Sequence, residues 1–187
     1  MEACKQFGRI DVLINNAGYG LIGAFETFSG EQIERQFQTN VFGLMEVTRA
    51  MLPHFRHNRQ GTIINVTSFA GRSTVPLYSV YHASKWAVEG FSDSLAFELE
   101  QFGIRVKIIE PGTIKTDFWG RSTDRENRTG IANYENYSKP ILRFIDTTAS
   151  RFSAQASDVA ATIFKAATDN SRQLRYTVGY DAKFTLL

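Results

Sequence analysis

The sequence predicts a doubly wound α/β fold with a parallel sheet. A short, nearly continuous apolar run at Ile10–Ile14 is typical of a parallel strand, which is buried on both faces. A second apolar strand, of alternating and continuous character, is predicted at Ile104–Ile109. Longer runs with apolar residues at helical spacing separate the strands. The chain has 187 residues and shows neither internal repeats nor a domain boundary. Residues 1–187 are therefore expected to form a single domain.

Composition narrows the class of protein. Hydrophobic residues make up 43% of the chain and charged residues 21%, as in globular domains. The net charge of +2 and the lack of a Lys/Arg cluster argue against a nucleic-acid partner. No apolar run approaches the ~18 residues of a membrane span, and no signal peptide opens the chain. A cytoplasmic location without a membrane span is expected.

Neither a metal site nor a disulfide is predicted. Cys4 is the single cysteine, which excludes an intramolecular disulfide and a thiolate zinc cage. His54 and His57 lie three residues apart, but the sequence supplies no carboxylate or third ligand close to them.

The first predicted elements are a helix end and a strand. Residues 1–7 read as the last turns of a helix that Gly8 closes. The strand Ile10–Ile14 then runs into the sequence Asn-Asn-Ala-Gly. We expect this strand to form an exposed apolar edge of the sheet.

Residues Gly18–Gly23 fit the G-x-G-x-x-G pattern of dinucleotide-binding proteins, but we reject that assignment. The pattern should open a helix directly and lead to a second strand. Here the helix begins later, with Ser29 as N-cap and Gln32 completing a capping box. The next predicted strand does not start until Thr62.

A long helix is predicted from about Gly30 to about Arg56. It contains Asn40, whose amide competes for backbone hydrogen bonds, so we expect a kink or a polar role there, or a solvent-facing side chain. A strand at Thr62–Val66 and a helix from Tyr81 to about Phe102 follow.

The second half of the chain carries the predicted edge loop and a lid. Pro and Gly in Glu110–Thr116 break the sheet at its carboxyl edge, where open α/β sheets bind ligands. Residues Asp117–Phe152 are mostly polar with scattered aromatic residues, which indicates an irregular, mobile lid over a pocket. A helix from about Ser157 to Thr168 and a strand at Arg175–Val178 complete the prediction.

Three residues suggest acid/base chemistry. Tyr81 and Lys85 lie four apart, so their side chains share one helix face. Lowering the tyrosine pKa from about 10 to ~7 requires ~4 kcal/mol, which a nearby cation in a partly desolvated site can supply. Ser68 could hold a carbonyl or alcohol oxygen beside the phenol. The alternatives are an ordinary half-exposed helix face and a serine that caps a turn.

Taken together, Asn15-Asn16-Ala17-Gly18, Ser68, Tyr81-x-x-x-Lys85 and Pro111-Gly112 resemble the classical short-chain dehydrogenase/reductase (SDR) family over nearly the whole chain. The resemblance implies a Rossmann-like, three-layer α/β/α fold and an oxidoreductase that interconverts a secondary alcohol and a ketone with NAD or NADP.

The resemblance also implies roles for individual residues. Tyr81 would be the general acid/base, Lys85 would lower its pKa and hold the nicotinamide ribose, and Ser68 would polarise the carbonyl. Asn40 would place a water in a proton relay to Lys85. The expected cofactor-binding residues are Asn15, Ala17, Gly18, Tyr81, Lys85, Pro111, Gly112, Ile114 and Thr116.

In relatives a first strand and a Gly-rich, pyrophosphate-binding turn precede the point at which this chain starts. The chain would then be the C-terminal portion of the catalytic domain. Two hypotheses follow: an active NAD(P)-dependent oxidoreductase, or a catalytically inactive fragment that keeps only the fold and the oligomer interface.

Partners follow from the same resemblance. Relatives pair through their two long helices, which implies a homodimer or homotetramer; Phe91, Leu95 and Leu99 would serve that interface or, equally, the core. The small-molecule partner would be an alcohol or ketone. A bulky apolar substrate is suggested by four loop aromatics, Tyr19, Phe69, Phe118 and Trp119, which could equally be lid packing.

Overall fold

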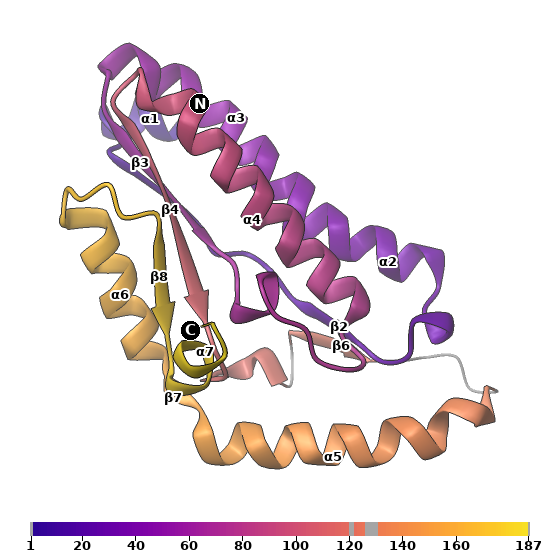
Figure 1. Cartoon of the computed structure of the whole chain (residues 1–187). Coiled ribbons are helices and arrows are strands. Elements are labelled where there is room, and N and C mark those ends of the chain that lie inside the picture. Colours follow the sequence, from indigo (N-terminus) through magenta and orange to yellow (C-terminus); the bar gives the residue numbers. More distant parts are fainter. Residues whose placement is uncertain (1, 120–121, 126–130, 187) are drawn as a thin grey trace.

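The computed structural model describes residues 2–119, 122–125 and 131–186. Its centre is a four-stranded parallel sheet with the order β1-β3-β4-β8 (Figure 1). The predicted doubly wound parallel sheet is confirmed. Its strands are β1 (Val12–Asn15), β3 (Gly61–Val66), β4 (Ile104–Pro111) and β8 (Arg175–Val178).

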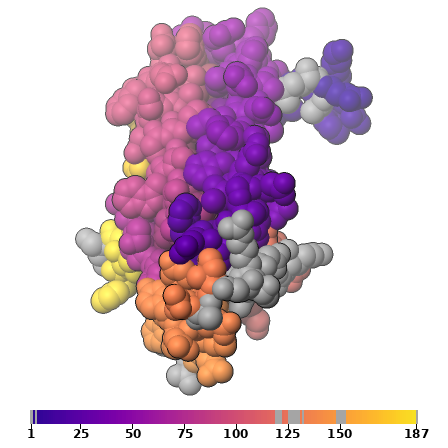
Figure 2. Space-filling view, turned by 90° about the vertical axis from the view of Figure 1, so that its right-hand side faces the viewer, coloured from indigo at the N-terminus to yellow at the C-terminus, as the bar shows by residue number. Residues whose placement is uncertain are grey.

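Helices cover both faces of this sheet and give three layers (Figure 1). One face carries α2 (Gly30–Phe37), the π-helical η2 (Gln38–Gly43), α3 (Leu44–Asn58) and α4 (Ser79–Glu100). The other face carries α6 (Ala156–Thr168). Figure 2 shows α2, η2 and α3 in purple and α4 in rose, running side by side.

Each face of the sheet has its own hydrophobic core, and β3 contributes to both. Ile63 packs with Phe55 and Leu99 under α3 and α4, whereas Ile64 packs with Tyr176 under α6. Both isoleucines are fully buried. Successive side chains of a strand point to opposite faces, so a strand covered on both sides has no polar face. This is why two isoleucines stand side by side in β3, although the strand also buries the polar Thr62 and Asn65.

The N-terminal predictions hold in the structure. Helix α1 (Glu2–Phe7) is followed by Gly8 at φ +74°, a left-handed conformation that glycine adopts without strain. The capping box between Ser29 and Gln32 is present. The segment Gly20–Ile22 forms a short strand, β2, and does not open a helix, in agreement with our rejection of the G-x-G-x-x-G assignment.

The long helix predicted at Gly30–Arg56 is interrupted at Asn40, as expected. The six residues of η2 form a π-helix, which often marks a functional position in a helix. The Asn40 side chain is 1% exposed, so the solvent-facing alternative is wrong.

The predicted irregular lid is wrong for its second half. Residues Glu135–Phe152 form helix α5, which crosses the carboxyl ends of the strands (Figure 1). Ile141, Leu142 and Ile145 pack from α5 against the cluster that contains Tyr81. Their helical spacing was obscured by Pro140 and the polar residues around it. Residues 120–121 and 126–130 of the predicted lid lie outside the described part of the chain.

Several short elements had not been predicted, because neighbours in the fold and not local patterns stabilise them. The strand β2 pairs with β6 (Thr123–Arg125), and β5 (Ile114–Lys115) pairs with β7 (Ala154–Gln155). The remaining elements are η1 (Phe25–Thr27), η3 (Phe69–Gly71), η4 (Asp117–Trp119), η5 (Ala132–Tyr134) and α7 (Tyr180–Thr185).

Two surface predictions have different outcomes. In the described sheet β1 is an edge strand, and its Ile14 is 47% exposed, as predicted. Leu95 and Leu99 are 5% exposed core residues with Phe91 packed against them, so the core alternative holds for all three. Pairing into dimers or tetramers stays a prediction. No helix among the described residues is long and apolar enough to cross a membrane.

Candidate active site

A cavity of about 770 Å³ opens at the carboxyl edge of the sheet. Ser68, just after β3, and Tyr81 and Lys85, on the first turns of α4, all line it. The structure therefore brings together the three residues for which the sequence predicted acid/base chemistry.

Ser68 lies between the end of β3 and the cavity wall. Its Oγ accepts a hydrogen bond from the Ala70 amide at 3.2 Å and donates to the Pro111 carbonyl at 3.3 Å. The serine is thus a cap of η3, as the alternative interpretation held, and also a cavity residue. The serine side chain also lowers the pKa of the Tyr81 phenol.

Burial controls the protonation of Tyr81 and Lys85. Desolvation raises the pKa of Tyr81 to about 12, although the hydrogen bond with Ser68 lowers it. Desolvation lowers the pKa of Lys85 to about 8. The predicted fall of the tyrosine pKa is therefore wrong for this state of the protein. The Lys85 Nζ atom lies 5.8 Å from the centre of the Tyr81 ring and donates to the Val66 carbonyl at 3.1 Å, so the cation does not offset the burial.

Asn40 lies beside the cavity without lining it. Its Oδ1 accepts from the Tyr19 amide at 3.0 Å, and its Nδ2 donates to the Tyr19 carbonyl at 2.9 Å and to Ser84 Oγ at 3.1 Å. Gln36 also donates to the Tyr19 carbonyl. These bonds fix the loop that carries Gly18 and Tyr19 into the cavity wall, and the water-placing role stays a prediction.

The expected cofactor-binding residues separate into two groups. The cavity is lined by Gly18, Pro111, Gly112, Ile114 and Thr116 in addition to Ser68, Tyr81 and Lys85. Asn15 and Ala17 are not among its lining residues. The Asn15 side chain is instead buried, and its amide donates hydrogen bonds to Thr48 and Asn65.

Sequence reasoning missed Ile14, Asn16 and Asp181 in the cavity wall. Asp181, on α7, accepts a hydrogen bond from the Thr113 amide at 2.7 Å and thereby holds the edge loop. The alternation along β1 could have suggested Ile14 and Asn16 in place of Asn15. A short terminal helix offers no comparable signal for Asp181.

The cavity has an apolar half. Phe69 and Phe118 line it, as the sequence suggested, and α5 adds Phe144 and Ile145. Tyr19 lines it as well, whereas the side chain of Trp119 lies outside the described part of the structure.

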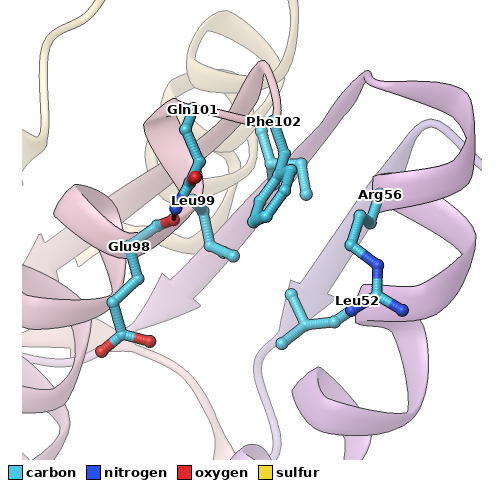
Figure 3. Close-up of a pocket in the computed structure, with 7 residues that line it drawn as sticks. Leu52, Arg56, Glu98, Leu99, Gln101 and Phe102 are labelled. Atoms are coloured by element: carbon cyan, nitrogen blue, oxygen red, sulfur yellow. Dashed lines mark hydrogen bonds between the residues drawn. The ribbon is translucent and has the colours of Figure 1, made fainter.

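A second hollow, of about 350 Å³, lies between the carboxyl ends of α3 and α4 (Figure 3). Leu52 and Arg56 face Leu99 and Phe102 across it. Tyr81 and Lys85 lie at the other end of α4.

Comparison with known proteins decides the family. The model of the short chain dehydrogenase family matches residues 1–127. The chain belongs to this family. An uncharacterized oxidoreductase of Schizosaccharomyces pombe is 40% identical over 178 residues, which cover 95% of this chain and 74% of the relative. Retinol dehydrogenase 8 of Bos taurus is 45% identical over 118 residues, or 63% of this SDR chain and 38% of that protein.

Solved structures agree with this family assignment. A short-chain dehydrogenase from Streptomyces avermitilis has a TM-score of 0.86 at 33% identity, over 99% of this chain and 66% of that one. The SDR chain thus spans roughly two thirds of that protein. Other structural neighbours are complexes with NADP or NADPH, and SDR enzymes use NAD(P).

The residues present fit the nicotinamide end of such a cofactor. Gly18 leaves room at the cavity wall, since a Cβ atom there would lie 3.2 Å from Asn40 Oδ1 and 3.6 Å from Lys85 Nζ. Lys85 has three N–H donors, of which the Val66 carbonyl takes one, so the ammonium can also bind ribose hydroxyls.

Proposed function

We propose that this SDR chain carries the catalytic site of an NAD(P)-dependent oxidoreductase that interconverts a secondary alcohol and a ketone. One observation supports this function above the others: Ser68, Tyr81 and Lys85 line a single cavity.

The chemistry of each residue follows from its state. The buried phenol of Tyr81 is neutral at pH 7, so it can donate its proton to a carbonyl oxygen that Ser68 Oγ–H also binds. The Lys85 ammonium stabilises the phenolate left behind and holds the ribose. When bound, NAD(P)H supplies the hydride. In the reverse direction the phenolate takes the proton of the alcohol.

Gly18, Pro111, Gly112, Ile114 and Thr116 would bind the nicotinamide half, because they line the same cavity as Ser68, Tyr81 and Lys85. Asn40 would act on the site through Tyr19 and Gly18, which it holds in place.

The substrate would be bulky and apolar. Aromatic and aliphatic side chains from the loop after β3, from η4 and from α5 leave an apolar space beside Tyr81. A relative named retinol dehydrogenase 8 supports a substrate of this class. Small polar ketones should therefore be poorer substrates than long-chain or polycyclic ones.

The test is turnover of a panel of ketones and secondary alcohols by the purified chain with NADPH and NADH. Tyr81→Phe should reduce the rate by a factor of about 10²–10⁴ with an unchanged circular dichroism spectrum. Tyr137→Phe is the matched control, because this tyrosine is exposed on α5.

Unchanged turnover in Tyr81→Phe would contradict the proposal. A folded chain that binds neither dinucleotide, nor turns over any substrate, would favour the inactive-fragment hypothesis. Binding by fluorescence energy transfer from Trp86 to the reduced nicotinamide separates these outcomes.

A further inference from the structure

A cluster of charged side chains, two of them buried carboxylates, lies next to the proposed catalytic residues. It joins Glu89 and Asp93 of α4, Glu110 of β4, Arg175 of β8 and Arg72, which follows η3. Glu89 is 4% exposed and Glu110 is fully buried, so neither carboxylate is a surface charge. The mechanism proposed above uses none of these residues.

Glu89 connects this cluster to the site by geometry. It lies one helical turn after Lys85 on α4. Its Oε1 accepts a hydrogen bond from Thr67 Oγ1 at 2.6 Å, and its Oε2 accepts from Arg175 Nε at 3.2 Å. Both contacts suit an ionised carboxylate, and they oppose the effect of burial, which raises the pKa of Glu89.

The same side chain supports the loop that carries Ser68. Thr67 directly precedes Ser68, and a Cβ atom on Gly71 would lie 2.8 Å from Glu89 Cγ. The loop therefore packs closely against Glu89, which fixes the distance between the end of β3 and α4.

The charges of the cluster do not balance among themselves. Three carboxylates, Glu89, Asp93 and Glu110, face two guanidinium groups, which leaves one negative charge. The Lys85 ammonium is buried beside them and donates to a backbone carbonyl. The negative charge of Glu89 offsets part of the cost of burying that cation.

We propose that Glu89 is a positioning residue of the active site, which anchors Thr67 to α4 and supplies the negative charge that keeps Lys85 an ammonium ion. The proposal rests on the role of Lys85 in the proposed function. Of the charged groups in the cluster, Glu89 is the one whose charge raises the pKa of Lys85 against the effect of burial. Burial and Glu110 in turn raise the pKa of Glu89, whereas Thr67 and Arg175 lower it.

The experiment is a titration of Lys85 in the intact chain by NMR of isotope-labelled lysine side chains, with the signal assigned through Lys85→Arg. Glu89→Gln keeps the shape of the side chain and removes its charge. The midpoint of Lys85 should fall by about one pH unit or more. The alkaline limb of the kcat/KM profile should move down by the same amount.

Asp93→Asn is the matched control. It removes the same charge, from the same partner Arg175, one turn further along α4 on a side chain that is 44% exposed. We expect its Lys85 midpoint to stay within about 0.3 units of the wild type, because water screens an exposed charge. Glu89→Asp should restore part of the shift. If Glu89→Gln does not fold, Glu89→Asp gives a smaller shift of the same sign.

An unchanged Lys85 midpoint in Glu89→Gln, or in Glu89→Asp where that variant replaces it, would overturn the proposal. An equal shift in Asp93→Asn would overturn it too. The titration needs no substrate, so its failure is distinguishable from that of the proposed function, which depends on turnover by Tyr81→Phe.

Discussion

Asn15 donates a side-chain hydrogen bond of 2.8 Å to Asn65, its register partner across β1 and β3. The bond belongs to a buried chain: Asn15 also donates to Thr48 of α3, and Asn65 donates to Ser92 of α4. Two neighbouring strands and both covering helices are thus joined just below the cavity. The asparagine expected to line the cofactor site instead holds the layers together.

Asn65→Ala should lower the free energy of unfolding by about 1–3 kcal/mol, because it removes two buried hydrogen bonds and leaves the Asn15 amide short of a partner. Urea unfolding measures the change. The exposed Asn133→Ala serves as the control and should stay within about 0.5 kcal/mol of the wild type. An equal loss in both variants would contradict a special role for the buried chain.

Lys85 should make stability rise with pH. Its pKa is about 8 in the folded protein and 10.5 when unperturbed, so between these values the unfolded chain binds a proton that the folded chain does not. Relative to Lys85→Met, the wild type should gain about 2 kcal/mol between about pH 7.5 and 9.5. Parallel pH profiles of the two proteins would contradict this.

The window for that comparison ends below pH 10 because Tyr81 acts in the opposite direction. Its pKa is raised from 10 to about 12, so its contribution is complete below pH 10 and is lost as the pH rises through 12. Tyr81→Phe should remove this alkaline loss.

Gly112→Ala should damage both stability and cofactor binding. A Cβ atom at Gly112 would overlap Asp181 Oδ1, and moving that carboxylate breaks its bond to the Thr113 amide. We expect a loss of about 1–3 kcal/mol in unfolding and a raised Kd for NADPH. Gly90→Ala, on the exposed face of α4 with open space around it, should stabilise by about 0.5–1 kcal/mol.

Phe55 tests the core under α3. It is fully buried and packs with Ile63 and Leu99, so Phe55→Ala should cost about 3–5 kcal/mol. Phe97→Ala, at an 81% exposed position of α4, removes the same group and should change stability by less than about 0.5 kcal/mol. Comparable losses would mean that Phe97 is covered by another molecule in solution.

The sheet and its long helices could be predicted because their signals are local. A strand such as β3 has buried isoleucines on both faces, and the capping box at Ser29 marks the start of α2 within four residues. The cavity set of Ser68, Tyr81 and Lys85 could be predicted because the ends of parallel strands meet at one edge.

What the sequence did not predict depends on contacts between distant segments. The strand β2 is three residues long and exists through its pairing with β6. Asn15 and Asn16 are indistinguishable by type, and the pleat of β1 alone decides which one faces the cavity. The protonation of Tyr81 follows from burial under α5 and η4, which no spacing of residues shows.

The π-helix η2, between α2 and α3, limits which insertions and deletions the sequence tolerates. Buried side chains recur every fourth residue there, at Gln36, Asn40, Leu44 and Thr48. An α-helix has 3.6 residues per turn, so such a row would drift away from the core, and the wide turn of η2 absorbs the drift. Deleting one residue of η2 would rotate α3 by about 100° relative to α2. Codon changes at its exposed positions are tolerable, whereas the loss of a single codon is not.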